Sequence, residues 1–432
     1  MGHSIRACWI GMQVAQAVGV EESLADDLYY ALLLKDAGCS ANAAQVSSWF
    51  GTDDHTVKMD LKQTNWSRMH EAVLYAVKHA APQERFSRRL GQMVQLSGRG
   101  FKGARQLVEM RCTRGAAIVR SLGWSGDVPD AVLNLDEHWD GQGHPRGAKG
   151  EEIPFMARVM LLSQTAEIFW RTRGSDGARQ VVRERRGTWF DPALVDTFLK
   201  LTENPEFFVQ LSQVDSPQSI RAAFPKMAAG FQGIRDVLKT AEIFGQIVDA
   251  KSPWTRLHSI RTAHYAKKIA GAMGLPEEET DVVMLAGFFH DLGKLGVSNL
   301  ILDKPGRLSA AERVAMEAHP QLTFRILEPL SDLRPIAEGA ACHHERLDGS
   351  GYYQGLSGSD IPLSAQIVAT SDVFDALTAE RPYRPGLSPD EAFAIMRLDA
   401  GGKLNGEALD ALMAISHPVA ASESLAEDVT RS

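Results

Sequence analysis

Histidine and aspartate side chains gather in the C-terminal half of the chain. They are His258, the pair His290-Asp291, His319, the pair His343-His344 and Asp372. Neutral imidazole and carboxylate groups are ligands for first-row divalent metal ions. One histidine on an apolar helix face is usually a core residue. Five histidines and two acids, each closing a helical stretch or opening a Gly-rich turn, instead predict a metal centre.

The number of ligands predicts two ions rather than one. Seven nitrogen and oxygen ligands exceed what a single octahedral ion takes while it keeps room for water. Two ions that share Asp291 as a bridge satisfy this arithmetic. Ions ~3.5–4 Å apart can deprotonate a shared water and stabilise both oxygens of an in-line displacement at phosphorus. The predicted reaction is therefore phosphoester hydrolysis by a hydroxide that two metals activate.

The segments that must position these ligands have the periodicity of helices. Apolar residues recur at spacings of three and four almost throughout, as at Ile260-Ala263-Ala266-Ile269, and alternating β-type runs are scarce. Segments that contain Pro and Gly, such as 304–307 and 348–358, break the helices. The sequence predicts an all-α fold.

The chain also repeats itself. Four segments of its first half match segments of its second half in the same order: 2–6 with 257–261, 34–38 with 289–293, 140–145 with 348–353 and, more loosely, 187–198 with 402–412. We predict two homologous helical domains, 1–202 and 251–415. A helical linker at 203–250 joins them, and a flexible tail at 416–432 follows.

The predicted linker carries an apolar seam at Met227, Phe231, Ile234, Leu238 and Ala241. These spacings of four and three are typical of a helix with one packed face. Two interpretations stay open. The helix packs on one of the domains, or it dimerises or transmits a change of state between them.

Length, charge and cysteine usage bound the partners. A chain of 432 residues is long enough for two or three domains. Its net charge of -8 argues against polymeric nucleic acid but not against a small phosphorylated ligand. The four cysteines are scattered, as in proteins of a reducing cytosol. No stretch approaches the ~20 apolar residues that span a bilayer, so we expect a cytoplasmic protein without a membrane partner.

Residues 251–415 resemble the HD-GYP family of the HD phosphohydrolases, which hydrolyse the bacterial messenger cyclic di-GMP. The resemblance is carried by His258-Ser259, His290-Asp291-Leu292-Gly293-Lys294, Ala318-His319-Pro320, His343-His344-Glu345-Arg346-Leu347-Asp348-Gly349-Ser350-Gly351-Tyr352 and the run from Ser371-Asp372 to Arg384-Pro385. It implies two tandem HD-domain-like folds, of which the second is catalytic. It also implies one metal ion on His258, His290, Asp291 and Asp372, and a second on Asp291, His319, His343 and His344.

The same resemblance implies further roles. Asp291 and Lys294 are expected to be catalytic, and the expected substrate contacts are Lys294, Tyr352, Arg381 and Arg384. Lysine and arginine suit phosphates and guanine edges, and a tyrosine ring stacks or donates a hydrogen bond. Iron or manganese is the implied metal, although zinc binds such ligands at least as tightly.

The chain departs from the family pattern at two positions. Tyr353 stands where the Gly-Tyr-Pro signature has proline, so this turn loses a fixed φ. Trp254 stands where some members have a glutamate that supports a third metal ion. Because an indole cannot take that role, we expect two ions.

The first repeat has lost most of the ligand set. His3 and Asp36 remain, whereas Lys35 stands in place of His290. The other replacements are Leu135-Asp136 for His343-His344, Gln164 for Asp372 and Arg111 for His319. We expect this domain to bind no catalytic metal and to serve in dimerisation, regulation or scaffolding.

The expected activity is hydrolysis of cyclic di-GMP to linear pGpG, to GMP or to both. Two alternatives stay open: an HD phosphohydrolase for another nucleotide, such as a different cyclic dinucleotide, and a non-catalytic signalling adaptor. The full ligand set argues against the adaptor. The expected partner is a cyclic dinucleotide, and a homodimer or a signalling protein partner stays open.

Overall fold

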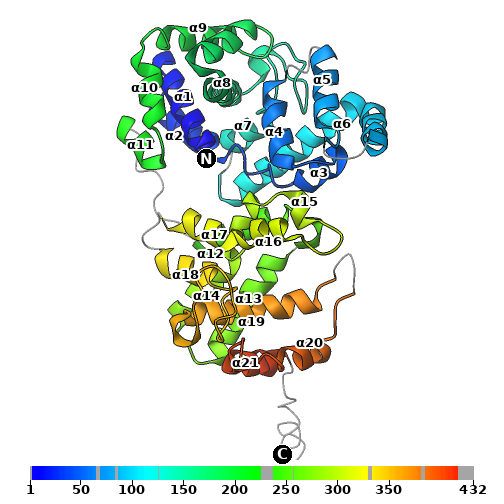
Figure 1. The fold of residues 1–432 in the computed structure, drawn as a ribbon. Coiled ribbons are helices and arrows are strands. Elements are labelled where there is room, and N and C mark those ends of the chain that lie inside the picture. The colour runs from blue at the N-terminus through cyan, green and yellow to red at the C-terminus, as the bar shows by residue number, and fades with distance from the viewer. Residues whose placement is uncertain are drawn as a thin grey trace, which may run out of the picture. The chain divides into compact units, whose positions relative to one another are not determined.

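The computed structural model describes residues 2–64, 69–82, 86–124, 126–224, 237–255, 257–328, 333–380 and 385–416. These residues form helices and loops, and among them no β-strand occurs apart from two isolated bridges, Arg186–Phe190 and Ala400–Leu404. The predicted all-α fold is confirmed. The helices form two compact units, Met1–Arg235 and Asp236–Ser432 (Figure 1).

The first unit is built around helix α1. Its helices are α1 His3–Val18, α2 Glu22–Leu34, α3 Ala43–Phe50, α4 Asp54–Gln63, α5 Met69–His79, α6 Phe86–Ser121, α7 Asp127–Leu133, α8 Phe155–Glu184, α9 Pro192–Leu201, α10 Glu206–Gln213 and α11 Pro217–Ala223. Helix α1 packs on α2, α8 and α9. The buried side chains of Ile10, Leu32, Met160 and Phe198 belong to the core that these helices share.

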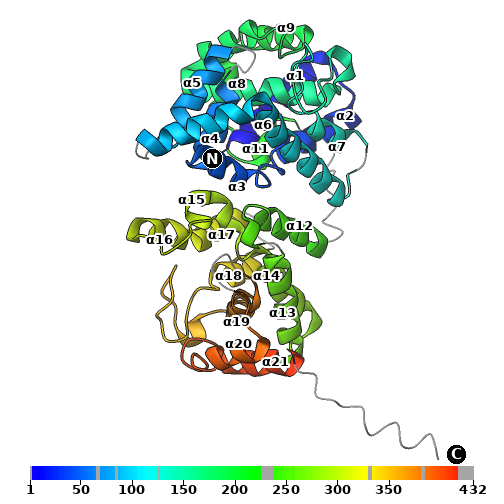
Figure 2. The same cartoon turned by 90° about the vertical axis from the view of Figure 1, so that its right-hand side faces the viewer.

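The second unit is built around helix α13. Its helices are α12 Val237–Asp249, α13 His258–Ala272, α14 Glu277–Phe289, α15 Asn299–Leu302, α16 Ala310–Glu317, α17 His319–Leu327, α18 Arg334–Ala341, α19 Leu363–Thr378, α20 Pro389–Met396 and α21 Gly406–Ser416, with the 3-10 turns η2 Pro253–Thr255, η3 Leu292–Gly296 and η5 Gly358–Asp360. Helix α13 packs on α14, α19 and α21 (Figure 2). Ala263, Phe288 and Ile367 are buried at these contacts.

The two units repeat one pattern of helix contacts. The pairs α1·α2, α1·α8, α2·α7 and α7·α8 of the first unit correspond to α13·α14, α13·α19, α14·α18 and α18·α19 of the second. The units differ in the segment between α2 and α7 of the first unit and in the corresponding segment between α14 and α18 of the second. The first unit carries α3 to α6 there, whereas the second carries the shorter helices α15 to α17. The helix contacts therefore follow the sequence repeat.

The predicted linker at 203–250 is divided between the units. Helices α10 and α11 pack on the first core through Phe207 and Ile220, and α12 packs on the second through Ala241 and Val248. Three residues of the predicted seam (Met227, Phe231 and Ile234) lie outside the described residues, as do 417–432 of the predicted tail. The predicted domain limits stay a prediction. Over the part of the chain that is described, none of the helices combines the length and hydropathy that a membrane span requires.

Candidate metal centre

The predicted ligands lie at helix ends in the second unit. His258 and His319 are the first residues of α13 and α17. His290 directly follows α14, and His343 follows the last residue of α18 by two positions. Asp372 lies within α19. Helix ends leave backbone carbonyls without partners inside the helix, and His290, His319 and His343 each lie just after the last residue of a helix, where such carbonyls can accept from a ring.

A close contact between the 3-10 turn η3 and helix α17 brings two of these segments together. Gly293 donates from its backbone N–H to Oγ1 of Thr323 at 2.9 Å, and that hydroxyl donates to the carbonyl oxygen of His290 at 3.1 Å. A Cβ atom on Gly293 would lie 1.9 Å from the carbonyl oxygen of His319. The glycine therefore allows the turn after Asp291 to approach the start of α17.

Three of the histidine rings are held in the same way. Nδ1 of His290, of His319 and of His343 lies 2.7, 2.7 and 2.6 Å from the carbonyl oxygen three residues earlier, in Gly287, Met316 and Ala340 respectively. A carbonyl can only accept, so Nδ1 must carry the proton. The lone pair of each ring is then on Nε2, the atom that is free to bind a metal ion.

The Nε2 atoms of His258, His290 and His319 lie near the carboxylate of Asp291. Its Oδ2 lies 3.4 Å from Nε2 of His290 and 3.6 Å from Nε2 of His258, and its Oδ1 lies 3.5 Å from Nε2 of His319. Two ligands on one ion at about 2.1 Å each are roughly 3.0–3.5 Å apart. Oδ2 of Asp291 thus faces His258 and His290 while Oδ1 faces His319, and a carboxylate that bridges two ions requires this division of its oxygens.

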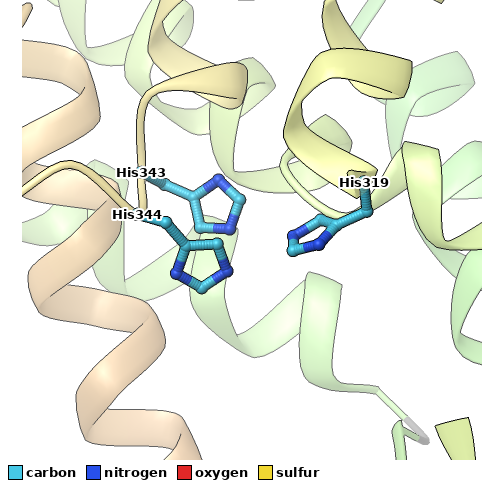
Figure 3. Close-up of side chains that lie close together, drawn as sticks. All are labelled: His319, His343 and His344. Carbon is cyan, nitrogen blue, oxygen red and sulfur yellow. The ribbon is translucent and has the colours of Figure 1, made fainter. Parts of the chain in front are cut away.

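The remaining predicted ligands complete the two groups. Oδ1 of Asp372 lies 3.3 Å from Nε2 of His258, and the rings of His343 and His344 have centroids 3.9 Å apart. Figure 3 shows these two rings projecting from one turn of the chain toward His319. Ligand atoms within 4.8 Å of one another form three overlapping groups: His258-His290-Asp372, His290-Asp291-His343 and His319-His343-His344.

The buried polar atoms of the site fit divalent cations. Nε2 of His290, His319 and His343 and Oδ1 of Asp291 are buried and have no hydrogen-bond partner among the described residues. A buried polar atom without a partner is costly. These four atoms lie close together, and all of them are of types that bind metals. A pair of transition-metal ions would supply the partners that they lack.

The two sides of the site differ in charge. Burial lowers the pKa of a histidine, yet the carboxylates of Asp372 and Asp375 raise the pKa of His258 to about 10. Burial lowers the pKa of His319 to about 4 and holds the pKa of His343 well below its usual range. One side therefore gathers the carboxylates of Asp372 and Asp375 around His258, and the other presents neutral imidazoles.

The expected substrate contacts are described in part. Nζ of Lys294 donates to Oδ2 of Asp291 at 2.6 Å. The ring of Tyr352 stacks on His344 with centroids 4.6 Å apart, and burial raises the pKa of its hydroxyl. Arg381 and Arg384 lie outside the described residues. The indole of Trp254 is 43% exposed and offers no ligand for a third ion.

Two buried acids beside the site were missed by the sequence reasoning. Oδ2 of Asp375 lies 2.6 Å from Nδ1 of His258. The carboxylate of Glu345 accepts hydrogen bonds from the backbone N–H groups of Gln354 and Leu356, at 2.6 and 3.1 Å. These hydrogen bonds fix the position of the turn that carries Tyr352. Both acids lie within the motifs quoted above, and their position in these motifs could have identified them as residues of the site.

The first unit retains the frame of this site but carries different groups. A Cβ atom on Gly38 would lie 2.0 Å from the carbonyl oxygen of Arg111. In the second unit, a Cβ atom on Gly293 would lie 1.9 Å from the carbonyl oxygen of His319. The contact of Gly38 places Arg111 at the position of His319, as the sequence predicted. Arg111 forms an ion pair with Asp136, and Lys35 forms one with Asp36. Side-chain cations thus stand beside the acids of this unit.

Comparison with known proteins adds independent findings. The family model described as "HD domain" matches residues 88–194 and 242–407. The 3'3'-cGAMP-specific phosphodiesterase 3 of Vibrio cholerae is 40% identical over 412 residues, which cover 95% of this chain and 89% of that protein. The cyclic di-GMP phosphodiesterase response regulator RpfG of Xanthomonas campestris is 41% identical over 156 residues, or 35% of this chain and 41% of that protein.

One solved structure is similar over nearly the whole chain. It is the crystal structure of a cyclic GMP-AMP specific phosphodiesterase of Vibrio cholerae, with a TM-score of 0.62 and 35% sequence identity. The similarity covers 95% of this chain and 92% of that one. Both units therefore have counterparts in a single relative.

Proposed function

This chain belongs to the HD-GYP family of the HD phosphohydrolases, and from that premise we propose that it is a metal-dependent phosphodiesterase that opens a cyclic dinucleotide. One observation carries the proposal. The buried ligand atoms of His290, His319 and His343 lie without hydrogen-bond partners, within the described residues, near the carboxylate of Asp291. Cations between these atoms would remove the cost of burying them.

The proposed centre holds two ions. His258, His290, Asp291 and Asp372 would hold one, and Asp291, His319, His343 and His344 would hold the other. Two such ions supply a water of lowered pKa and stabilise the charge that develops on phosphate oxygens. Iron or manganese is the proposed metal, with zinc as the alternative that the same ligands accept.

The chain's own residues would bind and orient the nucleotide. Lys294 is partly exposed and already donates to Asp291, so its ammonium can also donate to a phosphate oxygen that arrives beside that carboxylate. The ring of Tyr352, which stacks on His344, offers its other face to a base or sugar. Arg381 and Arg384 are proposed as further contacts on the strength of the family motif alone.

We propose 3'3'-cGAMP as the first candidate substrate and cyclic di-GMP as the second. Support for the first comes from a relative specific for 3'3'-cGAMP that matches 95% of this chain, across both units. Support for the second comes from a relative that matches 35% of it. The two nucleotides differ in one base. A site that hydrogen-bonds guanine O6 discriminates against adenine because its donor would lose a partner.

A substrate panel tests the proposal. Full-length protein of measured metal content is given 3'3'-cGAMP, cyclic di-GMP and cyclic di-AMP in parallel, and products are separated by chromatography. We expect metal-dependent opening of the ring, fastest for 3'3'-cGAMP, with a linear dinucleotide as the first product. Faster turnover of cyclic di-GMP would reverse the proposed order of substrates. Nucleotide binding without turnover by metal-loaded protein would overturn the proposed enzyme and favour a signalling adaptor.

A further inference from the structure

His258 is held differently from the three histidines that donate to a helix carbonyl. It is the first residue of α13. His319 also begins a helix, but it follows α16, and the carbonyl of Met316 at the end of α16 accepts from its ring. Among the described residues, the hydrogen-bond acceptor for Nδ1 of His258 is instead a side chain 117 residues away.

Asp375 supplies that acceptor. It lies on α19, three residues after Asp372, and is 1% exposed. Its Oδ2 accepts from Nδ1 of His258 at 2.6 Å and from Nη2 of Arg261 at 3.0 Å, and its Oδ1 also contacts Nε of Arg261. One carboxylate thus joins the first turn of α13 to α19, and the guanidinium balances its charge.

The first unit repeats this arrangement with a longer acid. Oε2 of Glu167 lies 2.5 Å from Nδ1 of His3, and its Oε1 accepts from Nε of Arg6 at 2.8 Å. On the other side of the His3 ring, Nζ of Lys35 lies 3.2 Å from Nε2. An ammonium can only donate, so the Nε2 lone pair of His3 faces a cation. The carboxylate fixes the same ring tautomer in both units.

We propose that Asp375 is a positioning residue of the metal centre, which holds the His258 ring so that the Nε2 lone pair faces the ion between His290, Asp291 and Asp372. This inference rests on the proposed function. An amide oxygen in place of Oδ2 would turn the NH2 group toward Nε of Arg261, which is itself a donor. The contact of Oδ1 with Arg261 and the negative charge beside His258 would both be lost, so the position requires a carboxylate.

Metal binding by two variants of the full chain tests this role. In Asp375→Asn we expect the affinity of apo protein for Mn²⁺ at the His258 side to fall 10–100-fold, as is typical when a partner of a metal-ligating histidine is changed. The second Mn²⁺ should bind as in the wild type. Asp375→Glu should restore most of the affinity, because Glu167 makes the same contacts in the first unit. Calorimetric titration with Mn²⁺ measures both constants without relying on turnover.

A matched control and a kinetic readout separate positioning from stability. Glu167→Gln removes the equivalent acid from the first unit and should leave both Mn²⁺ affinities unchanged. With nucleotide, Asp375→Asn should lower kcat more than it raises KM, because the substrate contacts remain. If Asp375→Asn fails to fold, Arg261→Gln takes its place, and a several-fold loss of the same Mn²⁺ affinity is expected.

The possible outcomes are distinguishable. Unchanged Mn²⁺ affinity in Asp375→Asn, or in Arg261→Gln where that variant replaces it, would overturn the role of Asp375 and leave the proposed centre intact. Equal loss of affinity in Asp375→Asn and in Asp375→Glu would also overturn it. A wild-type chain that binds no Mn²⁺ would instead contradict the proposed metal centre itself.

Discussion

Nζ of Lys35 lies 3.2 Å from Nε2 of His3 in the first unit and also contacts the carboxylate of Asp36. In the second unit the residue that corresponds to Lys35 is His290, and its Nε2 has no hydrogen-bond partner among the described residues. A lysine side chain thus accompanies His3 and Asp36 where the second unit has the predicted ligand His290. This relationship explains how two ligand-type residues persist in a unit that we expect to bind no metal.

The charge of Lys35 is predicted to stabilise the first unit. Its side chain is 0% exposed, and Lys35→Met would remove the ammonium that contacts Asp36 and His3. We expect a loss of about 3 kcal/mol in the free energy of unfolding, as when one partner of a buried ion pair is removed. Urea unfolding of the full chain, followed by circular dichroism, measures it.

Lys78→Met is the matched control for that variant. Lys78 pairs with Asp60 at 2.5 Å, but its side chain is 69% exposed. An exposed pair contributes roughly 0–1 kcal/mol, so this variant should unfold close to the wild type. Equal stability of the Lys35 and Lys78 variants would contradict the proposed role of the buried ammonium.

Loss of charge at Asp291 is predicted to abolish turnover while the fold survives. Asp291→Asn keeps the size of the side chain but removes the negative charge that faces His258, His290 and His319. We expect bound metal to fall below one ion per chain and activity to fall at least 1000-fold, or roughly 4 kcal/mol of transition-state stabilisation. Elemental analysis and circular dichroism check metal content and helicity. Undiminished turnover with helicity preserved would disprove the assignment of Asp291 as a bridging ligand.

The contact at Gly293 makes a stability prediction with a control in the same unit. In Gly293→Ala the new methyl group would lie 1.9 Å from the carbonyl oxygen of His319. We expect a loss of at least 2 kcal/mol, since overpacking against backbone typically costs about 1–3 kcal/mol, together with weaker metal binding. Gly271, within α13, has nothing within 4 Å of an added Cβ. Gly271→Ala should be neutral or stabilising by up to about 1 kcal/mol. Thermal unfolding of the two variants tests this difference, and equal melting temperatures would contradict it.

Much of this site could be predicted from the sequence because its information is local. The ligand types stand in short motifs, and spacings of three and four in the apolar residues predict helices whatever the tertiary fold. The sequence repeat aligned Arg111 with His319 despite an insertion, and the contacts of Gly38 and Gly293 support that alignment. The adjacent pair His290-Asp291 requires no long-range knowledge, because the two residues share one helix end.

Only the tertiary structure decided how the rings are held. Which nitrogen of His290 is protonated follows from a carbonyl three residues away, but the partner of His258 lies 117 residues away, on another helix. Asp375 is one acid among many in the sequence. Its role depends on the packing of α13 against α19, which brings the carboxylate within hydrogen-bond distance of the His258 ring. The spacing of the two residues along the chain carries no information about that distance. The same reason applies to Lys35. Its residue type predicts that this position binds no metal, whereas only the packing of α1 beside α2 shows that its ammonium faces Nε2 of His3.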